Sequence, residues 1–164
     1  MSRRWASMVI LLSASALFSQ APPQLGQASL DEVIAAMTPA EKVQLLVGAG
    51  MAGNFAGAII GKVYQDVPGA AGTTQPIPRL GIPAIVLADG PAGLRIAPRR
   101  DKDERTYYCT AFPVATMLAS TFDAGLVEKV GETMGKEVLE YGVDVLLGPA
   151  LNIHRNPLCG RNFE

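Results

Sequence analysis

The chain has 164 residues, of which 49% are hydrophobic, 18% charged and 6% aromatic. It carries 14 Lys plus Arg against 15 Asp plus Glu, which gives a net charge of -1. This composition excludes a disordered or collagen-like chain, and the near-neutral charge excludes a nucleic-acid-binding surface. The length allows one ordinary domain, but a complete eight-stranded α/β barrel typically needs ~250 residues.

The N-terminus has the layout of a secretory signal peptide. Two arginines precede an apolar run from Met8 to Phe18, and small residues follow. A membrane anchor is disfavoured because the run is shorter than the ~20 residues that a bilayer requires. We therefore expect residues 1–28 to be a signal peptide and spacer, cleaved after Ala21 or Ala28. Residues 29–164 are then one domain of a periplasmic or secreted protein.

The two cysteines, Cys109 and Cys159, have two interpretations. An oxidising compartment permits a disulfide between them, and their positions beside predicted strand-end loops suggest that the sulfurs approach one another. Two free thiols are the equal alternative. A metal site is not expected, because there is no CxxC motif and His154 is the only histidine.

Two helices are predicted after residue 28. Ser29 can cap a first helix whose apolar residues recur at helical spacing: Leu30, Val33, Ile34 and Met37. Thr38, Pro39 and Glu41 then form the start of a second helix, as N-cap, first helical residue and capping-box acid. Its expected buried stripe is Val43, Leu46 and Val47.

From Gly48 to Pro78 the chain is rich in Gly, Ala and Pro, which predicts an irregular loop with at most one weak helical turn. Gly48–Gly53 satisfies the letters of the dinucleotide-binding GxGxxG motif. That motif requires a strand before the glycines and a helix after them, whereas the preceding residues are typical of a helix. A nicotinamide-dependent oxidoreductase is therefore a minor alternative, and a flexible entrance loop is favoured.

The remainder follows the order strand, excursion, helix and strand. Ile85–Leu87 is an apolar run that ends at Asp89, Asp123 caps an amphipathic helix that Gly142 terminates, and Val143–Leu147 is a second apolar run. This order predicts a parallel βαβ unit. Asp144, within the second run, is expected to be a paired structural acid.

Polar residues gather where these strands end. Asp89 and Arg95 follow the first strand, and 152–161 follows the second, so we expect them to face a common mouth. A carboxylate acceptor and a planar guanidinium suit sugar hydroxyls. The structural alternative is that Asp89 caps a turn, that Arg95 pairs with a surface acid, and that His154 belongs to a hydrogen-bond network.

Four segments together resemble family 3 of the glycoside hydrolases, of the bacterial exported β-glucosidase and β-xylosidase type. They are MTPAEKVQLL, PRLGIPAIVLADGPAGLR, CTAFPVATMLASTFD and, most specifically, GPALNIHRNPLCGRNFE. The resemblance implies an α/β fold, the N-terminal portion of a (β/α)8 TIM-type barrel. It also implies that Asp89, Arg95 and Arg161 hold the hydroxyls of the terminal sugar.

The resemblance further implies a retaining enzyme with two carboxyl groups ~5 Å apart, a nucleophile and an acid/base. In the family both lie beyond the GRNFE motif, so no catalytic residue is expected in this chain, and Glu164 is assigned an orienting role. No metal or organic cofactor is implied. The expected function is the N-terminal part of an exo-acting β-glycosidase acting on an oligosaccharide or β-glycoside, inactive by itself. The alternative is a noncatalytic carbohydrate-binding or sensing protein.

Overall fold

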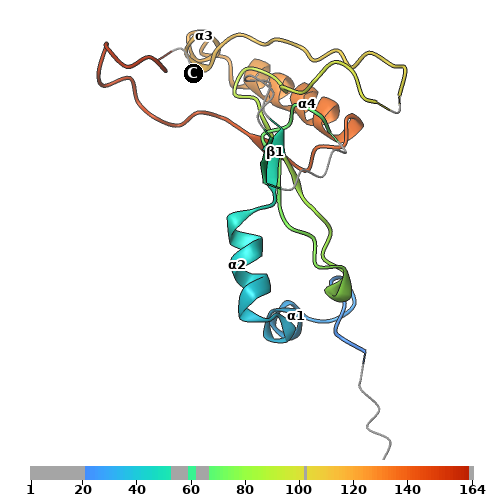
Figure 1. The fold of residues 1–164 in the computed structure, drawn as a ribbon. Coiled ribbons are helices and arrows are strands. Elements are labelled where there is room, and N and C mark those ends of the chain that lie inside the picture. Colours follow the sequence, from blue (N-terminus) through green and yellow to red (C-terminus); the bar gives the residue numbers. More distant parts are fainter. Residues whose placement is uncertain (1–20, 53–58, 62–66, 102, 163–164) are drawn as a thin grey trace, which may run out of the picture.

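The computed structural model describes residues 21–52, 59–61, 67–101 and 103–162, in two parts joined by strands (Figure 1). The predicted signal segment before residue 21 and Glu164 lie outside the described residues. The elements are α1 (Leu30–Ala36), α2 (Pro39–Val47), β1 (Gly50–Ala52), β2 (Ile59–Gly61), β3 (Gly72–Thr73), the 3-10 helix η1 (Pro78–Leu80), β4 (Val86–Asp89), α3 (Ala115–Ala119), α4 (Ala124–Glu140) and β5 (Val145–Leu147).

The lower part consists of α1, α2 and η1, and both α-helices begin as predicted. The Ser29 and Thr38 hydroxyls each accept a hydrogen bond from the backbone N–H of the third residue of their helix. That third residue, Glu32 or Glu41, accepts a hydrogen bond from the backbone N–H of the cap in turn. The helices and η1 enclose a small apolar core made of Val33, Met37, Ile77 and Leu80. Two local caps and this core therefore define the lower part.

Arg79 ties the two helices together. Its Nε donates to Glu41 Oε1 at 2.7 Å, and its Nη2 donates both to Glu41 Oε2 and, at 2.9 Å, to the Ala36 carbonyl. One guanidinium thus satisfies a carbonyl at the end of α1 and the acid at the start of α2. Hydrogen bonds from Arg79 and then from the Thr38 backbone lower the pKa of Glu41 from 4.5 to about 2.

The apolar stripe predicted for α2 is not buried. Val43, Leu46 and Val47 are 59%, 88% and 79% exposed, and Leu45 is the residue of this helix that packs against the small core. The prediction was wrong because helical spacing identifies an apolar face but not what covers it. In the described residues that face has no cover.

The upper part contains a five-stranded sheet in the order β2-β1-β3-β4-β5. All neighbours are antiparallel except β4 and β5, which are parallel in the register Leu87↔Val145, Ala88↔Leu146 and Asp89↔Leu147. The predicted parallel unit is therefore confirmed. The interval from Gly48 to Pro78, expected to be irregular, instead contributes three short strands.

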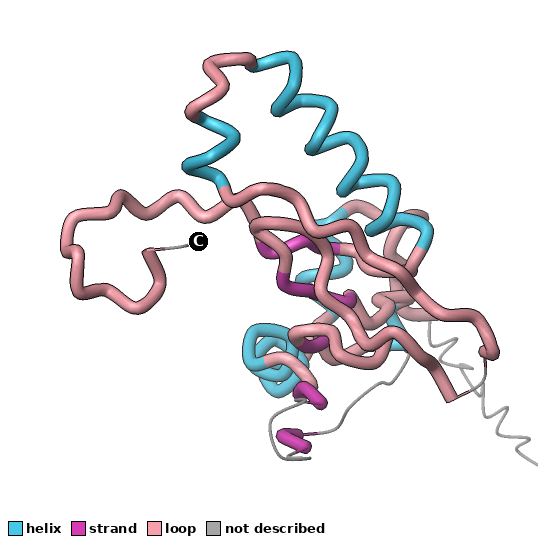
Figure 2. The backbone as a smooth tube through the Cα atoms, turned by 90° about the horizontal axis from the view of Figure 1, so that it is seen from above, coloured by secondary structure: helices cyan, strands magenta, loops and turns pink. Residues whose placement is uncertain are grey.

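The core of the upper part lies between β4 and α4. Val138 and Val143 pack with Val86, Ala88 and Leu94. Seen from above, α4 runs along one side of the strands, and the chain after β5 loops out beyond them (Figure 2). The Asp144 carboxylate accepts the Val86 N–H at 2.8 Å, so this acid is paired as predicted, with backbone as its partner.

Among the helices of the described residues, none is both long and apolar enough to cross a bilayer.

Candidate functional site

A tight turn at the carboxyl end of β4 carries Asp89 and Arg95, both of which are exposed. The Arg95 N–H donates to the Asp89 carbonyl at 2.9 Å, which closes the turn. A Cβ on Gly90 would lie 2.5 Å from the Gly93 oxygen and 2.6 Å from Leu146 Cδ1. Close packing therefore requires glycine at position 90, and the turn fixes the backbone positions of Asp89 and Arg95.

A hollow of about 300 Å³ lies beside this turn. Its wall includes residues 91–95 on one side, and Cys109, Thr110 and Ala111 on the other. The two walls are bonded to one another, because the Phe112 N–H donates to the Ala92 carbonyl at 2.9 Å. Arg95 therefore opens onto a small hollow built from two connected loops.

Helix α4 holds the second wall. Both carboxylate oxygens of Glu137 accept the Thr110 N–H, at 3.2 and 3.1 Å, and the Thr110 hydroxyl also donates to Glu137. The Tyr141 hydroxyl donates to the Tyr108 carbonyl at 2.7 Å. Glu137 was not among the predicted site residues, because its partner lies far away along the chain and no local pattern indicates such a pair.

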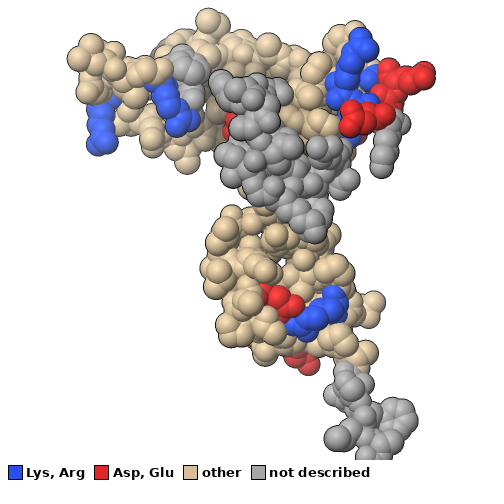
Figure 3. Space-filling view, viewed as in Figure 1, with Lys and Arg blue, Asp and Glu red and all other residues tan. Residues whose placement is uncertain are grey.

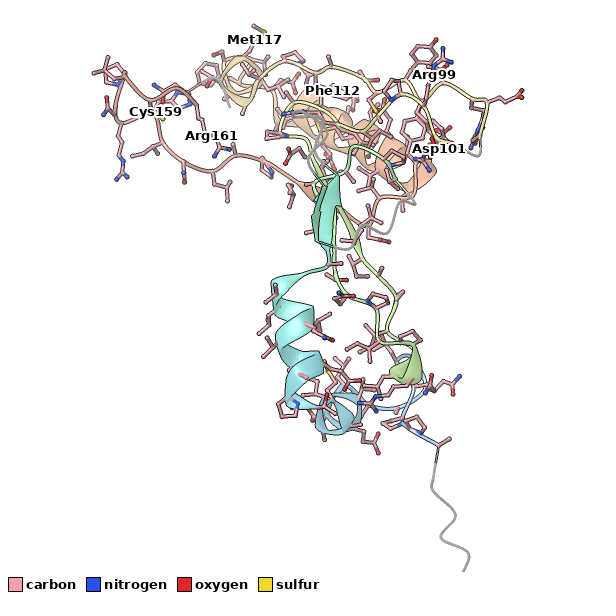
Figure 4. All side chains as sticks on the ribbon, viewed as in Figure 1. Arg99, Asp101, Phe112, Met117, Cys159 and Arg161 are labelled. Atoms are coloured by element: carbon pink, nitrogen blue, oxygen red, sulfur yellow. The ribbon has the colours of Figure 1, made fainter. Side chains whose placement is uncertain are left out.

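The segment after β5 begins beside the Asp89 turn and then leaves it. A Cβ on Gly148 would lie 3.3 Å from the Gly90 oxygen, so the ends of β4 and β5 meet as predicted. Residues 150–162 then form a loop around a second hollow of about 680 Å³, whose wall includes His154 and Arg161. Figure 4 shows Arg161 and Cys159 on this outlying segment.

The structure brings Asp89 and Arg95 together but places Arg161 elsewhere. Among the described residues, the two hollows share no lining residue, and Asp89 lines neither of them. The ends of β4 and β5 therefore lie together at Gly90 and Gly148, as expected, but Arg161 does not face Asp89 and Arg95. The assignment of Asp89, Arg95 and Arg161 to sugar binding stays a prediction.

Charged side chains on the face shown in Figure 3 lie in three places: on the lower part, on the 99–105 loop of the upper part, and, as Lys or Arg alone, on the outlying segment at the left. In that loop, Arg105 Nε donates to Asp103 at 2.9 Å, and the Tyr107 hydroxyl does so at 2.7 Å. Hydrogen bonds from Tyr107 and then from Arg105 lower the pKa of Asp103 to about 2. Arg100 stacks 3.9 Å from the centre of the Tyr107 ring. These contacts fold the loop back on itself at the end opposite Arg161.

The two cysteines are free thiols in the structure. Cys109 is partly buried in the first hollow, and Cys159 is exposed in the second, so the predicted approach of the two sulfurs is not observed. Burial, and then the Glu137 charge, raise the pKa of the Cys109 thiol. No metal-binding group of His, Cys, Asp and Glu occurs in the described part of the chain.

The dinucleotide-binding interpretation of Gly48–Gly53 fails on its structural context. Gly48 caps the C-terminus of α2, so a helix precedes the glycines where the motif requires a strand. β1 then begins at Gly50 and pairs antiparallel with its neighbours. The described residues 48–52 therefore lack the strand-to-helix context that the motif requires.

Comparison with known proteins identifies the family. The model of the glycosyl hydrolase family 3 N-terminal domain matches residues 29–164, and the chain belongs to this family. It is a partial α/β fragment of that domain, as the fold prediction stated. Among curated relatives, thermostable β-glucosidase B of Acetivibrio thermocellus is 48% identical over 95 residues.

Solved structures agree with this assignment. β-Glucosidase 3B of Thermotoga neapolitana, in complex with α-D-glucose, is 58% identical with a TM-score of 0.70 over 82% of this chain. A β-glucosidase of Paenibacillus barengoltzii is 34% identical with a TM-score of 0.61 over 84% of it. This chain spans 12% of the Acetivibrio relative, 18% of the Thermotoga chain and 13% of the Paenibacillus chain. The homologues are thus β-glucosidases several times longer than this chain.

Proposed function

We propose that this chain is the N-terminal part of an exported, retaining β-glycosidase of the β-glucosidase type. It supplies part of the pocket for the terminal sugar, within the opening portion of a (β/α)8 barrel. The supporting observation is the closed turn that holds Asp89 and Arg95 at the carboxyl end of β4, where parallel sheets build their sites. A relative that shares 58% identity binds glucose. The signal-like N-terminus supports export to the periplasm or medium.

In the proposed glycosidase reaction, the residues of this chain bind and orient the sugar. The Asp89 carboxylate accepts hydrogen bonds from sugar hydroxyls, and the Arg95 guanidinium donates to others. Arg161 joins them once the outlying segment is folded inward. Hydroxyl contacts of this kind strengthen as the ring distorts towards the oxocarbenium-like transition state. The nucleophile and the acid/base belong to the part of the protein that follows residue 164.

The test is Asp89→Ala in the complete gene product that carries residues 1–164, assayed on an aryl β-glucoside. Loss of charged hydrogen bonds made in the transition state should lower kcat/KM about a hundredfold or more. The melting temperature should not change, because Asp89 is exposed. Asp101→Ala, an exposed aspartate on the distant 99–105 loop, is the matched control and should retain full activity.

Two results would contradict the proposal. One is near-normal kcat/KM for Asp89→Ala with an unchanged melting temperature. The other is a gene without an aspartate nucleophile downstream, whose product binds glucose but hydrolyses no aryl β-glucoside or β-xyloside. That second result would support the noncatalytic sugar-binding alternative.

A further inference from the structure

We propose that Glu137 of α4 is a positioning residue of the sugar pocket, which acts through Thr110 on the Asp89–Arg95 turn. That the pocket binds a sugar rests on the proposed function. The link from Glu137 to the turn rests only on contacts within this chain. It connects a helix on one side of the sheet to two binding residues that Glu137 does not touch.

The first step of the link joins Glu137 to Thr110. One carboxylate receives the Thr110 N–H on both oxygens and the Thr110 hydroxyl on one. Hydrogen bonds to a charged acceptor are the strong kind, and two donors from one residue fix its position and its orientation. The Tyr141 hydroxyl, one helical turn further on, binds the Tyr108 carbonyl at 2.7 Å. α4 and its C-cap residue Tyr141 thus hold the 108–110 segment at two points.

The second step joins Thr110 to the turn. The Gly93 backbone lies directly against the Thr110 carbonyl, since a Cβ there would be 2.1 Å from that oxygen and 3.4 Å from the Phe112 ring. Phe112 also donates its N–H to the Ala92 carbonyl at 2.9 Å. The N–H of Thr110 is therefore hydrogen-bonded to Glu137, and its carbonyl is in close contact with Gly93.

The third step joins Gly93 to the binding residues. Gly93 donates its N–H to the Gly90 carbonyl at 3.3 Å, and Arg95 donates its N–H to the Asp89 carbonyl at 2.9 Å. Leu94, between them, is buried in the core of the upper part. Any displacement of Thr110 is passed by direct contact to the loop that carries Asp89 and Arg95.

The experiment compares Glu137→Ala, Glu137→Gln and a control in the complete gene product. The control is Glu140→Gln, which removes an exposed acid from the same helix. Glu137→Ala should raise KM for an aryl β-glucoside and lower kcat/KM about tenfold, because the sugar contacts are displaced. Glu137→Gln keeps one acceptor oxygen and should recover part of that loss. Glu140→Gln should match the wild type.

Two further measurements separate positioning from general destabilisation. Amide hydrogen exchange should quicken in 90–95 and 110–112 of Glu137→Ala while β4 and β5 keep wild-type protection. Thr110→Val removes the hydroxyl donor to Glu137. Glu137→Ala should therefore lower kcat/KM by a smaller factor in the Thr110→Val variant than in the wild type.

Each outcome bears on the proposal. Unchanged exchange and unchanged kcat/KM in Glu137→Ala would overturn it, as would equal effects of Glu140→Gln. Additive effects of Thr110→Val and Glu137→Ala would overturn the route through Thr110. An inactive wild-type enzyme would refute the proposed function instead, and the exchange data would then decide the mechanical link by themselves.

Discussion

Gly93→Ala is the sharpest structural test of the Asp89–Arg95 turn. Gly93 has a φ of +120°, which L side chains rarely adopt, and its added Cβ would lie 2.1 Å from the Thr110 oxygen. The two segments would have to separate by about 1 Å to restore a normal contact. Neither can move freely, because Thr110 is held by Glu137 and Leu94 is buried.

The expected cost has two sources. Backbone strain at such a φ costs about 1–3 kcal/mol, and forced overpacking costs a further ~1–3 kcal/mol. We therefore expect the turn to lose about 2–6 kcal/mol of local stability. Gly135→Ala provides a control of opposite sign, since a Cβ there meets nothing within 4 Å in the middle of α4. It should stabilise the helix by about 0.5–1 kcal/mol.

The assay is amide hydrogen exchange of both variants in the complete gene product, with the melting temperature measured alongside. Gly93→Ala should lose protection in 90–95 and 110–112, and Gly135→Ala should gain it within α4. Wild-type protection at 110–112 in Gly93→Ala would refute the close contact between Gly93 and Thr110, on which the expected loss of stability rests. A loss of protection in Gly135→Ala would refute the open space described around that glycine.

Two other predictions concern the isolated domain and its pH dependence. Residues 29–164, expressed alone, should aggregate, because Leu151, Ile153 and Leu158 are at least 80% exposed. They should also hydrolyse no glycoside, because the nucleophile and the acid/base are expected outside them. Light scattering and aryl β-glucoside assays test this, and a cooperatively melting monomer or co-purifying turnover would contradict it. In the complete gene product, Glu41→Gln should lower the melting temperature at neutral pH. Because the pKa of Glu41 is lowered from 4.5 to about 2, its contribution is complete above pH 4.5 and fades as the pH falls towards 2. The two melting temperatures should converge over that interval, and a constant difference would contradict the assignment.

Local patterns predicted α1, α2, α4 and the βαβ unit, but not α3 or η1. A capping box joins residues three apart, so Thr38 and Glu41 suffice to predict the start of α2. The apolar runs that end at Asp89 and Leu147 likewise predicted β4 and β5. These features depend on neighbours in sequence.

Features that depend on distant partners were missed. β1, β2 and β3 are two or three residues long, too short to show the alternation of a strand, and pairing alone defines them. The contacts of Glu137 with Thr110 and of Arg79 with Glu41 join residues far apart in sequence. Position after a strand singled out Asp89, Arg95 and 152–161. The family resemblance assigned Asp89, Arg95 and Arg161 to sugar binding, and the structure places the first two in one turn.

The division into two apolar clusters sets an order of assembly during synthesis. The lower cluster uses only residues between Ala28 and Ile82, whereas the upper one needs partners from Val67 to Leu146. At ~5–20 residues per second, the ribosome adds the intervening stretch in several seconds. The lower part can therefore close while Val86 and Ala88 still await α4. During that interval the nascent β4 is the segment that a chaperone would have to shield.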